Sequence, residues 1–230
     1  MLVDLKRAVC EANLELVREG LVIQTFGNVS SVDRATGNFV IKPSGVGYHV
    51  LKPERMVVVS VETAKVVEGD WRPSSDTPTH GVLYRAFKDI AAIVHTHSLH
   101  ATAWAQARRQ IPALGTTHAD CFHGPVPVTR LLTAKEVRED YESNTGHVIV
   151  ERFRKLDPLA MPAVLVANHA PFVWGQTLDD AVRNAVALEY CARLASETVR
   201  LRPGSRSIPT ALLDKHFLRK HGCQASYGQK

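Results

Sequence analysis

Residues 90–98 read IAAIVHTHS, an apolar run that ends in two histidines and a serine. The run Ile90–Val94 is typical of a buried β-strand, because β-branched side chains pack well in a pleated sheet. Side chains at positions i and i+2 of a strand point to the same face, so His95 and His97 would project together. This spacing suits a bidentate metal clamp. By itself the pair is a weak motif, and two hydrogen-bonded polar residues at a strand end are the alternative.

Two further residues extend the possible ligand set. His169 follows the apolar run Ala163–Ala167, where a buried strand would emerge, and Asp76 precedes a helix predicted from Thr77. Without further context, Asp76 is expected to be a helix N-terminal carboxylate. Three histidines, with or without a carboxylate, suit Zn²⁺ or another divalent transition metal. The sequence has no HExxH motif, so a catalytic metal here would polarise a substrate oxygen rather than activate water.

Three small polar pairs lie in predicted loops: Gly27-Asn28, Ser44-Gly45 and Ser74-Ser75. Loops of this kind can present backbone N–H groups and hydroxyls to a phosphate, and Lys42 is close to the second pair. None of the pairs matches a P-loop or a dinucleotide fingerprint, and each alone is typical of an ordinary turn. Together they indicate an anionic ligand.

The surrounding sequence predicts strands in adjacent groups, with helices before and after them. The strands are expected over residues 21–26, 39–42, 56–61, 65–68, 90–97, 125–129, 163–167 and 171–174. The helices are expected from residue 2 to Gly20 and over residues 77–88, 98–108, 133–142, 147–155, 177–201 and 209–221. Thr77, Ser98 and Thr133 are the predicted caps, the last in a capping box with Glu136. This order favours an α/β fold with a largely antiparallel central sheet flanked by helical layers.

The composition is that of a soluble globular protein, with 230 residues, 45% hydrophobic content and a net charge of +5. A single domain over residues 1–230 is expected, without a membrane helix or a secretory signal. The four cysteines are scattered with no CxxC, which favours reduced thiols and the cytoplasm. The positive charge allows nucleic acid, a membrane surface or a small anion as partner. The basic cluster Lys215, Arg219 and Lys220 has no accompanying nucleic-acid motif and is predicted to be a solvated helix face.

Taken in order, the motifs resemble the L-ribulose-5-phosphate 4-epimerases of the class II aldolase/adducin superfamily. The resemblance runs nearly end to end. It rests on residues 25–30, 42–46, 73–80, 95–98, 115–120, 169–172, 213–216 and 227–229. One departure is Ala170, which stands where the superfamily often has glycine after the third metal histidine. Alanine would be strained there if the backbone needs a positive φ.

The resemblance implies inversion of C4 of L-ribulose 5-phosphate to give D-xylulose 5-phosphate. The C3–C4 bond breaks by a retro-aldol step, glycolaldehyde phosphate turns, and the bond closes on its other face. The implied zinc set, one ion per subunit, is Asp76, His95, His97 and His169. The implied phosphate-binding residues are Gly27, Asn28, Ser44, Gly45, Ser74 and Ser75.

The resemblance also implies that Asp120 and Tyr227 are the acid/base pair. Two groups are needed because a proton is taken on one face of the carbinol and returned on the other. Family members are C4 homotetramers with interfacial sites, and this pair comes from the neighbouring subunit. His216 and Glu142 are further candidates for contacting substrate or positioning these groups, with a cap or surface role as the alternative.

Two other functions compete with the epimerase. L-Fuculose- or L-rhamnulose-phosphate aldolases release the two fragments and place a glutamate near the position of Asp76. An adducin-like binding domain keeps the fold without catalysis, although the complete candidate metal set argues against it. The resemblance predicts a role in carbohydrate metabolism and leaves arabinose and ascorbate breakdown both open. No nucleic acid or membrane partner is expected.

Overall fold

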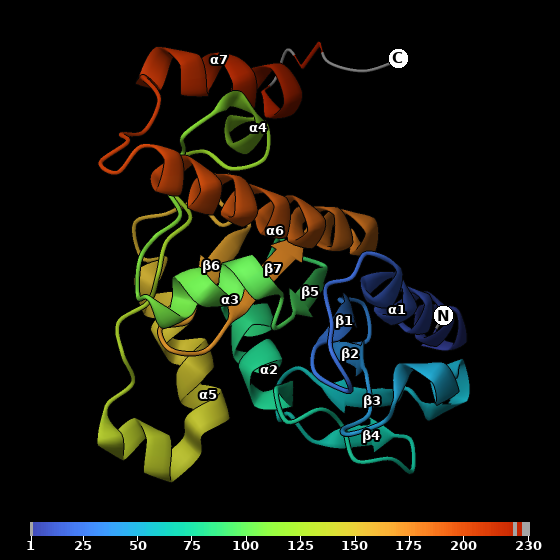
Figure 1. Ribbon diagram of the computed structural model, residues 1–230. Helices are drawn as coiled ribbons and strands as arrows, with labels where there is room; N and C mark the ends of the chain where they lie inside the picture. The colour runs from blue at the N-terminus through green and yellow to red at the C-terminus, as the bar shows by residue number, and fades with distance from the viewer. Residues whose placement is uncertain (1, 223–224, 227–230) are drawn as a thin grey trace.

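The computed structural model describes residues 2–222 and 225–226, and its centre is one antiparallel sheet (Figure 1). Seven strands of the described chain lie in the order β4-β3-β2-β1-β5-β7-β6, and every neighbouring pair is antiparallel. The strands are β1 (Asn28–Asp33), β2 (Asn38–Ile41), β3 (Val57–Ser60), β4 (Val66–Glu68), β5 (Ala92–His95), β6 (Ala163–Leu165) and β7 (Pro171–Gly175). The predicted fold class is confirmed.

Helices cover both faces of this sheet. They are α1 (Leu2–Arg18), α2 (Thr77–Ala86), α3 (Leu99–Gln106), α4 (Thr116–Ala119), α5 (Ala134–Arg152), α6 (Leu178–Leu201) and α7 (Thr210–His221), with 3₁₀ turns at Tyr48–Val50 and Pro53–Arg55. Helices α1, α3 and α6 pack on one side and α2 and α5 on the other, while α4 and α7 lie together beyond α6 (Figure 1). No helix among the described residues is long and apolar enough to cross a membrane.

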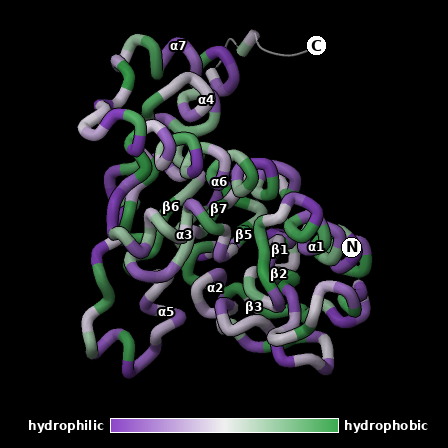
Figure 2. Tube along the Cα trace, viewed as in Figure 1, coloured by the Kyte–Doolittle hydropathy of each residue, from purple (hydrophilic) through white to green (hydrophobic). Residues whose placement is uncertain are grey.

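The strands carry the main hydrophobic core. Figure 2 shows hydrophobic residues along the strands and an alternation of hydrophobic and hydrophilic residues along the helices. Trp174 on β7 is fully buried, and its ring contacts Phe87 and Phe153, the residues directly after α2 and α5. Its indole N–H donates to the carbonyl of Pro158 at 2.7 Å, which satisfies its one polar atom. This packing fixes β7, and therefore the loop before it, relative to the neighbouring helices.

The strand predicted at residues 21–26 is wrong, and the true strand is β1. Gln24 and Gly27 have positive φ angles of 54° and 87°, so the backbone turns before β1 begins. β1 escaped prediction because it buries polar residues on both faces. Ser30 bonds the side chains of His80 and Tyr84, and Ser31 donates to the carbonyl of Ala91. Their hydrogen bonds offset the cost of burying these serines. Because the serines are polar, however, β1 lacks the alternation of apolar and polar residues that marks a strand in a sequence.

Residues 125–129 do not form a strand either. They make only isolated bridges, from Val126 to Ile111 and from Val128 to Leu165. Pro125 and Pro127 lack the N–H groups that a ladder requires. The two helices predicted at 133–142 and 147–155 are one element, α5, which continues across a kink at Asp140.

Of the three predicted helix caps, only Thr133 makes the expected side-chain hydrogen bond. The capping box of Thr133 and Glu136 is confirmed in both directions. The N-cap of α2 is Asp76 rather than Thr77, and its carboxylate makes no capping bond. Ser98 is the N-cap of α3, but its side chain does not cap. The carboxylate of Glu189 on α6 accepts from the backbone N–H groups of His100 and Ala101 instead, a tertiary contact that local sequence cannot show.

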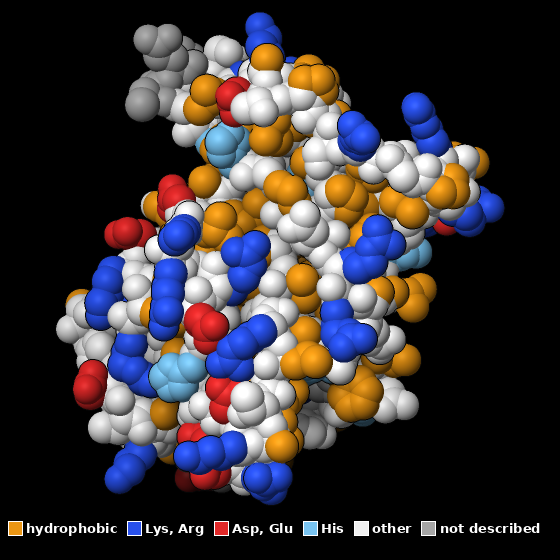
Figure 3. All heavy atoms as spheres, turned by 90° about the vertical axis from the view of Figure 1, so that its left-hand side faces the viewer, with side chains coloured by type: hydrophobic (Ala, Val, Ile, Leu, Met, Phe, Trp, Pro, Cys, Tyr) orange, Lys and Arg blue, Asp and Glu red, His pale blue; other side chains and the backbone are white. Residues whose placement is uncertain are grey.

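The net positive charge is spread over the surface. Figure 3 shows Lys and Arg side chains across one face with Asp and Glu among them. Arg130, for example, is paired with Glu136 and Glu151. The prediction of a solvated face on α7 is wrong for Arg219 and Lys220, because both contact Asp120.

Candidate metal and substrate site

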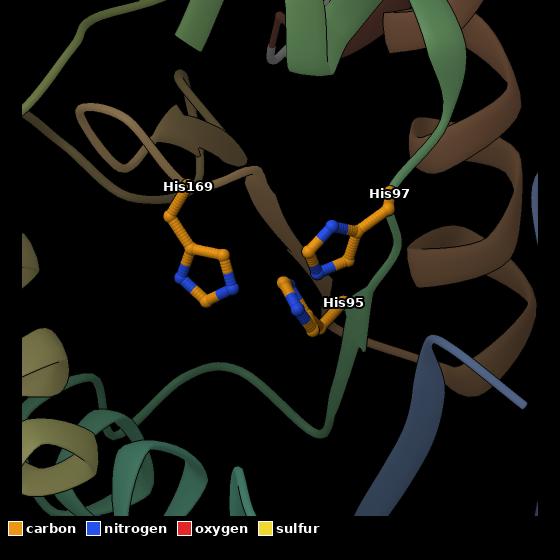
Figure 4. Close-up of side chains that lie close together, drawn as sticks. All are labelled: His95, His97 and His169. Atoms are coloured by element: carbon orange, nitrogen blue, oxygen red, sulfur yellow. The ribbon is translucent and has the colours of Figure 1, made fainter. Parts of the chain in front are cut away.

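Three histidines meet at one end of the sheet. His95 ends β5, His97 follows two residues later, and His169 lies in the loop between β6 and β7 (Figure 4). One ring nitrogen from each lies within 4.8 Å of the other two. The pairing of β5 with β7 brings them together, because His95 is in register with Phe172. A single ion could therefore take a ligand from each residue.

The environment of His95 leaves one nitrogen ready for a metal. Its side chain is buried and stacks on Phe172 with ring centroids 4.2 Å apart. Nδ1 lies 2.9 Å from the carbonyl of Pro171, which can only accept, so Nδ1 carries the proton and Nε2 keeps its lone pair. Burial lowers the pKa of His95 and of His169 to about 3. Both imidazoles are therefore neutral near pH 7, as metal ligation requires.

Asp76 lies beside this cluster without belonging to the three-histidine group. Its Oδ2 is 3.9 Å from Nε2 of His95 and accepts a 2.7 Å hydrogen bond from Nδ2 of Asn28. Asn28 is the register partner of His95 on β1, which explains the contact. The Oδ1 atom of Asn28 is buried and has no hydrogen-bond partner among the described residues. An unsatisfied acceptor at this place fits a ligand with a hydroxyl or a positive charge.

The three polar pairs line a single cavity of about 350 Å³ next to the histidines. Its wall includes all six predicted phosphate-binding residues: Gly27, Asn28, Ser44, Gly45, Ser74 and Ser75. Two backbone hydrogen bonds align the second and third pairs, from Ser44 N to the carbonyl of Arg72 and from Ser74 N to the carbonyl of Lys42. The fold thus brings three separate loops to one cavity, and phosphate binding by these six residues stays a prediction.

Lys42 adds a positive charge to this cavity. Its side chain is buried, with Nζ 3.3 Å from the carbonyl of Thr25 and 4.8 Å from the ring centroid of Tyr48. Burial lowers the pKa of Lys42 to about 8, because no carboxylate offsets the desolvation of its ammonium group. An anion in the cavity would supply the missing opposite charge.

Asp120 is not among the residues that line the cavity of its own chain. It is the C-cap of α4, and its carboxylate contacts α7 through His216 at 2.9 Å, Arg219 at 3.0 Å and Lys220 at 3.4 Å. Burial by itself would raise the pKa of Asp120, but the hydrogen bonds from His216 and Arg219 outweigh it and hold the pKa below its ordinary value. Tyr227 lies outside the described residues.

Two adjacent residues of α5 also line the cavity. Glu142, expected as a further candidate, lies there, and so does Tyr141, which was not predicted as a site residue. No local motif identifies Tyr141, because the kink at Asp140 brings it there.

The backbone strain considered for Ala170 in the loop between β6 and β7 does not arise. The residue with positive φ in this loop is Asn168, at 60°, and Ala170 needs no left-handed backbone.

Three histidines that could hold a metal ion, beside a cavity lined by small polar loops, form a site of the kind that metal-dependent enzymes use. The family model described as the Class II Aldolase and Adducin N-terminal domain matches residues 7–196. The chain therefore belongs to the class II aldolase and adducin family.

Within this family, the chain is similar to proteins whose names state an activity. Proteins named L-ribulose-5-phosphate 4-epimerase UlaF from Salmonella paratyphi A and Salmonella typhi are each 53% identical over 226 residues. The aligned region covers 98% of this chain and 99% of each relative.

The fold is also that of solved class II aldolases. A structure titled L-fuculose 1-phosphate aldolase aligns with a TM-score of 0.78 at 28% identity, covering 93% of this chain and 94% of the other. YgbL from Klebsiella pneumoniae, described as a putative aldolase/epimerase/decarboxylase, gives a TM-score of 0.73 at 25% identity, covering 94% and 98%.

Proposed function

We propose that this protein is a zinc-dependent L-ribulose-5-phosphate 4-epimerase that forms D-xylulose 5-phosphate by cleavage and re-addition at C3–C4. The main support for this proposal is that the three polar loops and the histidine cluster share one cavity, in a chain that is 53% identical to named epimerases. A divalent ion held by His95, His97 and His169, with Asp76 beside them, would stabilise the negative charge that develops as C3–C4 breaks. One ion per subunit is proposed, and another divalent transition metal would serve the same chemistry.

The residues around the cavity support binding of a sugar phosphate. Ser44 and Ser74 offer hydroxyls, Gly45 and Ser75 offer backbone N–H groups, and Lys42 offers a buried charge. Asn28 links this region to the metal cluster, because its amide nitrogen holds Asp76 while its unpartnered oxygen can accept a substrate hydroxyl. The phosphate would thus lie at one side of the cavity and the reacting carbons beside the histidines.

Proton transfer at the C4 hydroxyl is assigned to Asp120 and Tyr227 of a neighbouring subunit in a homotetramer. The position of Asp120 supports this assignment, since it lies outside its own cavity on the α4–α7 projection (Figure 1). Leu212 and Leu218 on α7 are exposed, at 39% and 54%, which suits a helix that meets a second copy. Asp120 is ionised near pH 7, but its lowered pKa makes it a weak base within a single chain, so efficient proton transfer requires that its pKa rise where it meets the neighbouring subunit's cavity.

The remaining assignments follow from this function. The substrate is a small sugar phosphate, the proposed location is the cytoplasm, and neither nucleic acid nor membrane is a partner. Cys10, Cys121 and Cys191 are free thiols, which agrees with a reducing compartment.

The deciding experiment is an assay with L-ribulose 5-phosphate on protein with and without a chelator. Epimerisation to D-xylulose 5-phosphate is expected, with loss of activity on metal removal and recovery on adding Zn²⁺. Free glycolaldehyde phosphate as the main product would instead identify a sugar-phosphate aldolase, the alternative that the structural likeness to L-fuculose 1-phosphate aldolase favours. Absence of stoichiometric metal after loading would favour a non-catalytic adducin-like domain.

A further inference from the structure

Tyr141 makes a side-chain contact with the histidine cluster. Its hydroxyl lies 3.3 Å from Nδ1 of His169, and the two rings are 6.0 Å apart between centroids. Figure 4 shows the other ring nitrogen of His169 facing His95 and His97. The nitrogen that faces a shared ion is thus Nε2, and the nitrogen that meets Tyr141 is on the opposite side of the ring.

This contact completes a pattern that His95 already shows. Nδ1 of His95 is fixed by a carbonyl, which leaves Nε2 for the metal. Nδ1 of His169 meets a hydroxyl instead, which can accept the Nδ1 proton and still direct its own proton elsewhere. Partners of this kind orient metal-binding histidines and select their tautomer.

The fold holds Tyr141 firmly in this position. Asp140 breaks the helical geometry of α5 with φ −159° and ψ 78°, and its carboxylate accepts from the backbone N–H of Ser143 at 3.2 Å. Thr145 donates to the carbonyl of Tyr141 at 2.9 Å. Thr79 on α2 donates to the carbonyl of Glu142 at 2.5 Å. The kinked turn is therefore tied to α2, the helix that begins beside Asp76.

We propose that Tyr141 is a positioning residue for His169: its hydroxyl accepts the Nδ1 proton and so presents the Nε2 lone pair to the divalent ion. The inference rests on the proposed metal-dependent function and deepens it. Because Tyr141 also lines the cavity, its own hydroxyl proton would remain available to a sugar phosphate bound there.

The test compares wild type with Tyr141→Phe, which keeps the ring and removes only the hydroxyl. Tyr190→Phe is the matched control, because Tyr190 lies on α6 with 56% of its surface exposed. Zn²⁺ dissociation constants are measured by competition with a chromogenic chelator, and the Co²⁺ forms are compared by their visible spectra. Tyr141→Phe is expected to bind Zn²⁺ about tenfold more weakly and to shift the Co²⁺ bands. Tyr190→Phe should match wild type in both.

A second measurement needs no variant. In the metal-free protein, nitrogen NMR of labelled histidine should show His169 protonated at Nδ1, whereas an imidazole without this partner is free to carry the proton on Nε2. A proton on Nε2 in wild type would overturn the proposal even if Tyr141→Phe failed to fold. Equal Zn²⁺ affinity and identical spectra for the two proteins would overturn it as well. Failure of wild type itself to bind metal would remove both this proposal and the proposed function.

Discussion

Lys42 illustrates how one side chain can oppose folding and serve binding. Its buried ammonium group lies near the backbone carbonyl of Thr25 and the ring of Tyr48, and its pKa falls to about 8. In the unfolded chain the same group would have its ordinary, higher pKa. The charged form is therefore disfavoured by folding near pH 7, and an anionic ligand would reverse that preference.

This leads to a pH prediction. Below about pH 8 Lys42 is charged and attracts the substrate phosphate, so kcat/KM should fall as the pH rises through that value. Lys42→Met should lose this dependence and raise KM, while its melting temperature at pH 7 should rise because the buried charge is gone. Rate profiles from pH 6 to 9 and thermal unfolding check both parts. A Lys42→Met enzyme with the wild-type profile would show that Lys42 does not contact the anion.

Gly27 is a second residue whose backbone decides the site. Its φ is +87°, and an added Cβ would lie 3.0 Å from the carbonyl oxygen of His95. Gly27→Ala is expected to lower the free energy of unfolding by about 2 kcal/mol or more and to weaken metal binding. Gly37→Ala is the matched control, because Gly37 has φ +68° with open space around it. It should cost only about 1 kcal/mol. Urea unfolding of both variants measures these free energies. Equal losses of unfolding free energy would show that the close approach of Gly27 to His95 has no energetic effect.

Among the secondary-structure elements, α5 is divided by its kink into a first half outside the cavity and a second half whose first residues line it. The capping box of Thr133 begins the first half. Asp140 caps the second half at the point where Tyr141 and Glu142 enter the cavity. The amide of Asn144 donates to the carbonyl of Glu136 across the kink, which satisfies a group that the break would leave unpaired.

Two substitutions on α5 should separate these roles. Thr133→Ala and Asp140→Ala each remove one capping interaction and should each lower the free energy of unfolding by about 1 kcal/mol. Only Asp140→Ala should also lower kcat/KM, by about tenfold or more, because it releases the turn that carries Tyr141. Unfolding curves and steady-state rates measured side by side test this. Equal activity in the two variants would mean that the kink has no role in the site.

In the whole molecule, the two groups of residues to which we assign the proposed chemistry do not meet within one chain. The metal cluster and cavity lie at one end of the sheet, whereas Asp120 lies with α4 and α7 beyond α6 (Figure 1). A closed ring of identical subunits can bring one copy's projection to the next copy's cavity. The tetramer is proposed for this reason.

Mixing two inactive variants tests this arrangement. His97→Asn damages the metal cluster, and Asp120→Asn damages the base, so each homotetramer should be nearly inactive. Tetramers re-formed from an equal mixture should regain about a quarter of wild-type activity, because a quarter of the interfaces pair an intact cluster with an intact Asp120. If the mixture were no more active than the separate variants, either His97 and Asp120 would act in the site of the same chain, or Asp120 would have no role in catalysis.

Features that depend on residues close together in the chain could be predicted from the sequence. The pair His95 and His97 follows from the two-residue period of a strand, and the box of Thr133 and Glu136 follows from the first turn of a helix. The loop pairs at Asn28, Ser44 and Ser74 are short polar motifs of the same local kind. The antiparallel fold class followed from the grouping of strands and helices.

Which of these features lie close together in space follows from long-range packing, which the sequence patterns did not show. The order β2-β1-β5-β7 places Asn28 opposite His95 and brings the loop of His169 beside both, a consequence of pairing between segments far apart in sequence. Long-range packing also made β1 hard to predict, because its buried Ser30 finds hydrogen-bond partners on α2 and its buried Ser31 finds one at Ala91. The same kind of packing brings Tyr141 to His169 through the kink in α5. Local patterns cannot encode these contacts, since each depends on a partner that only the folded chain provides.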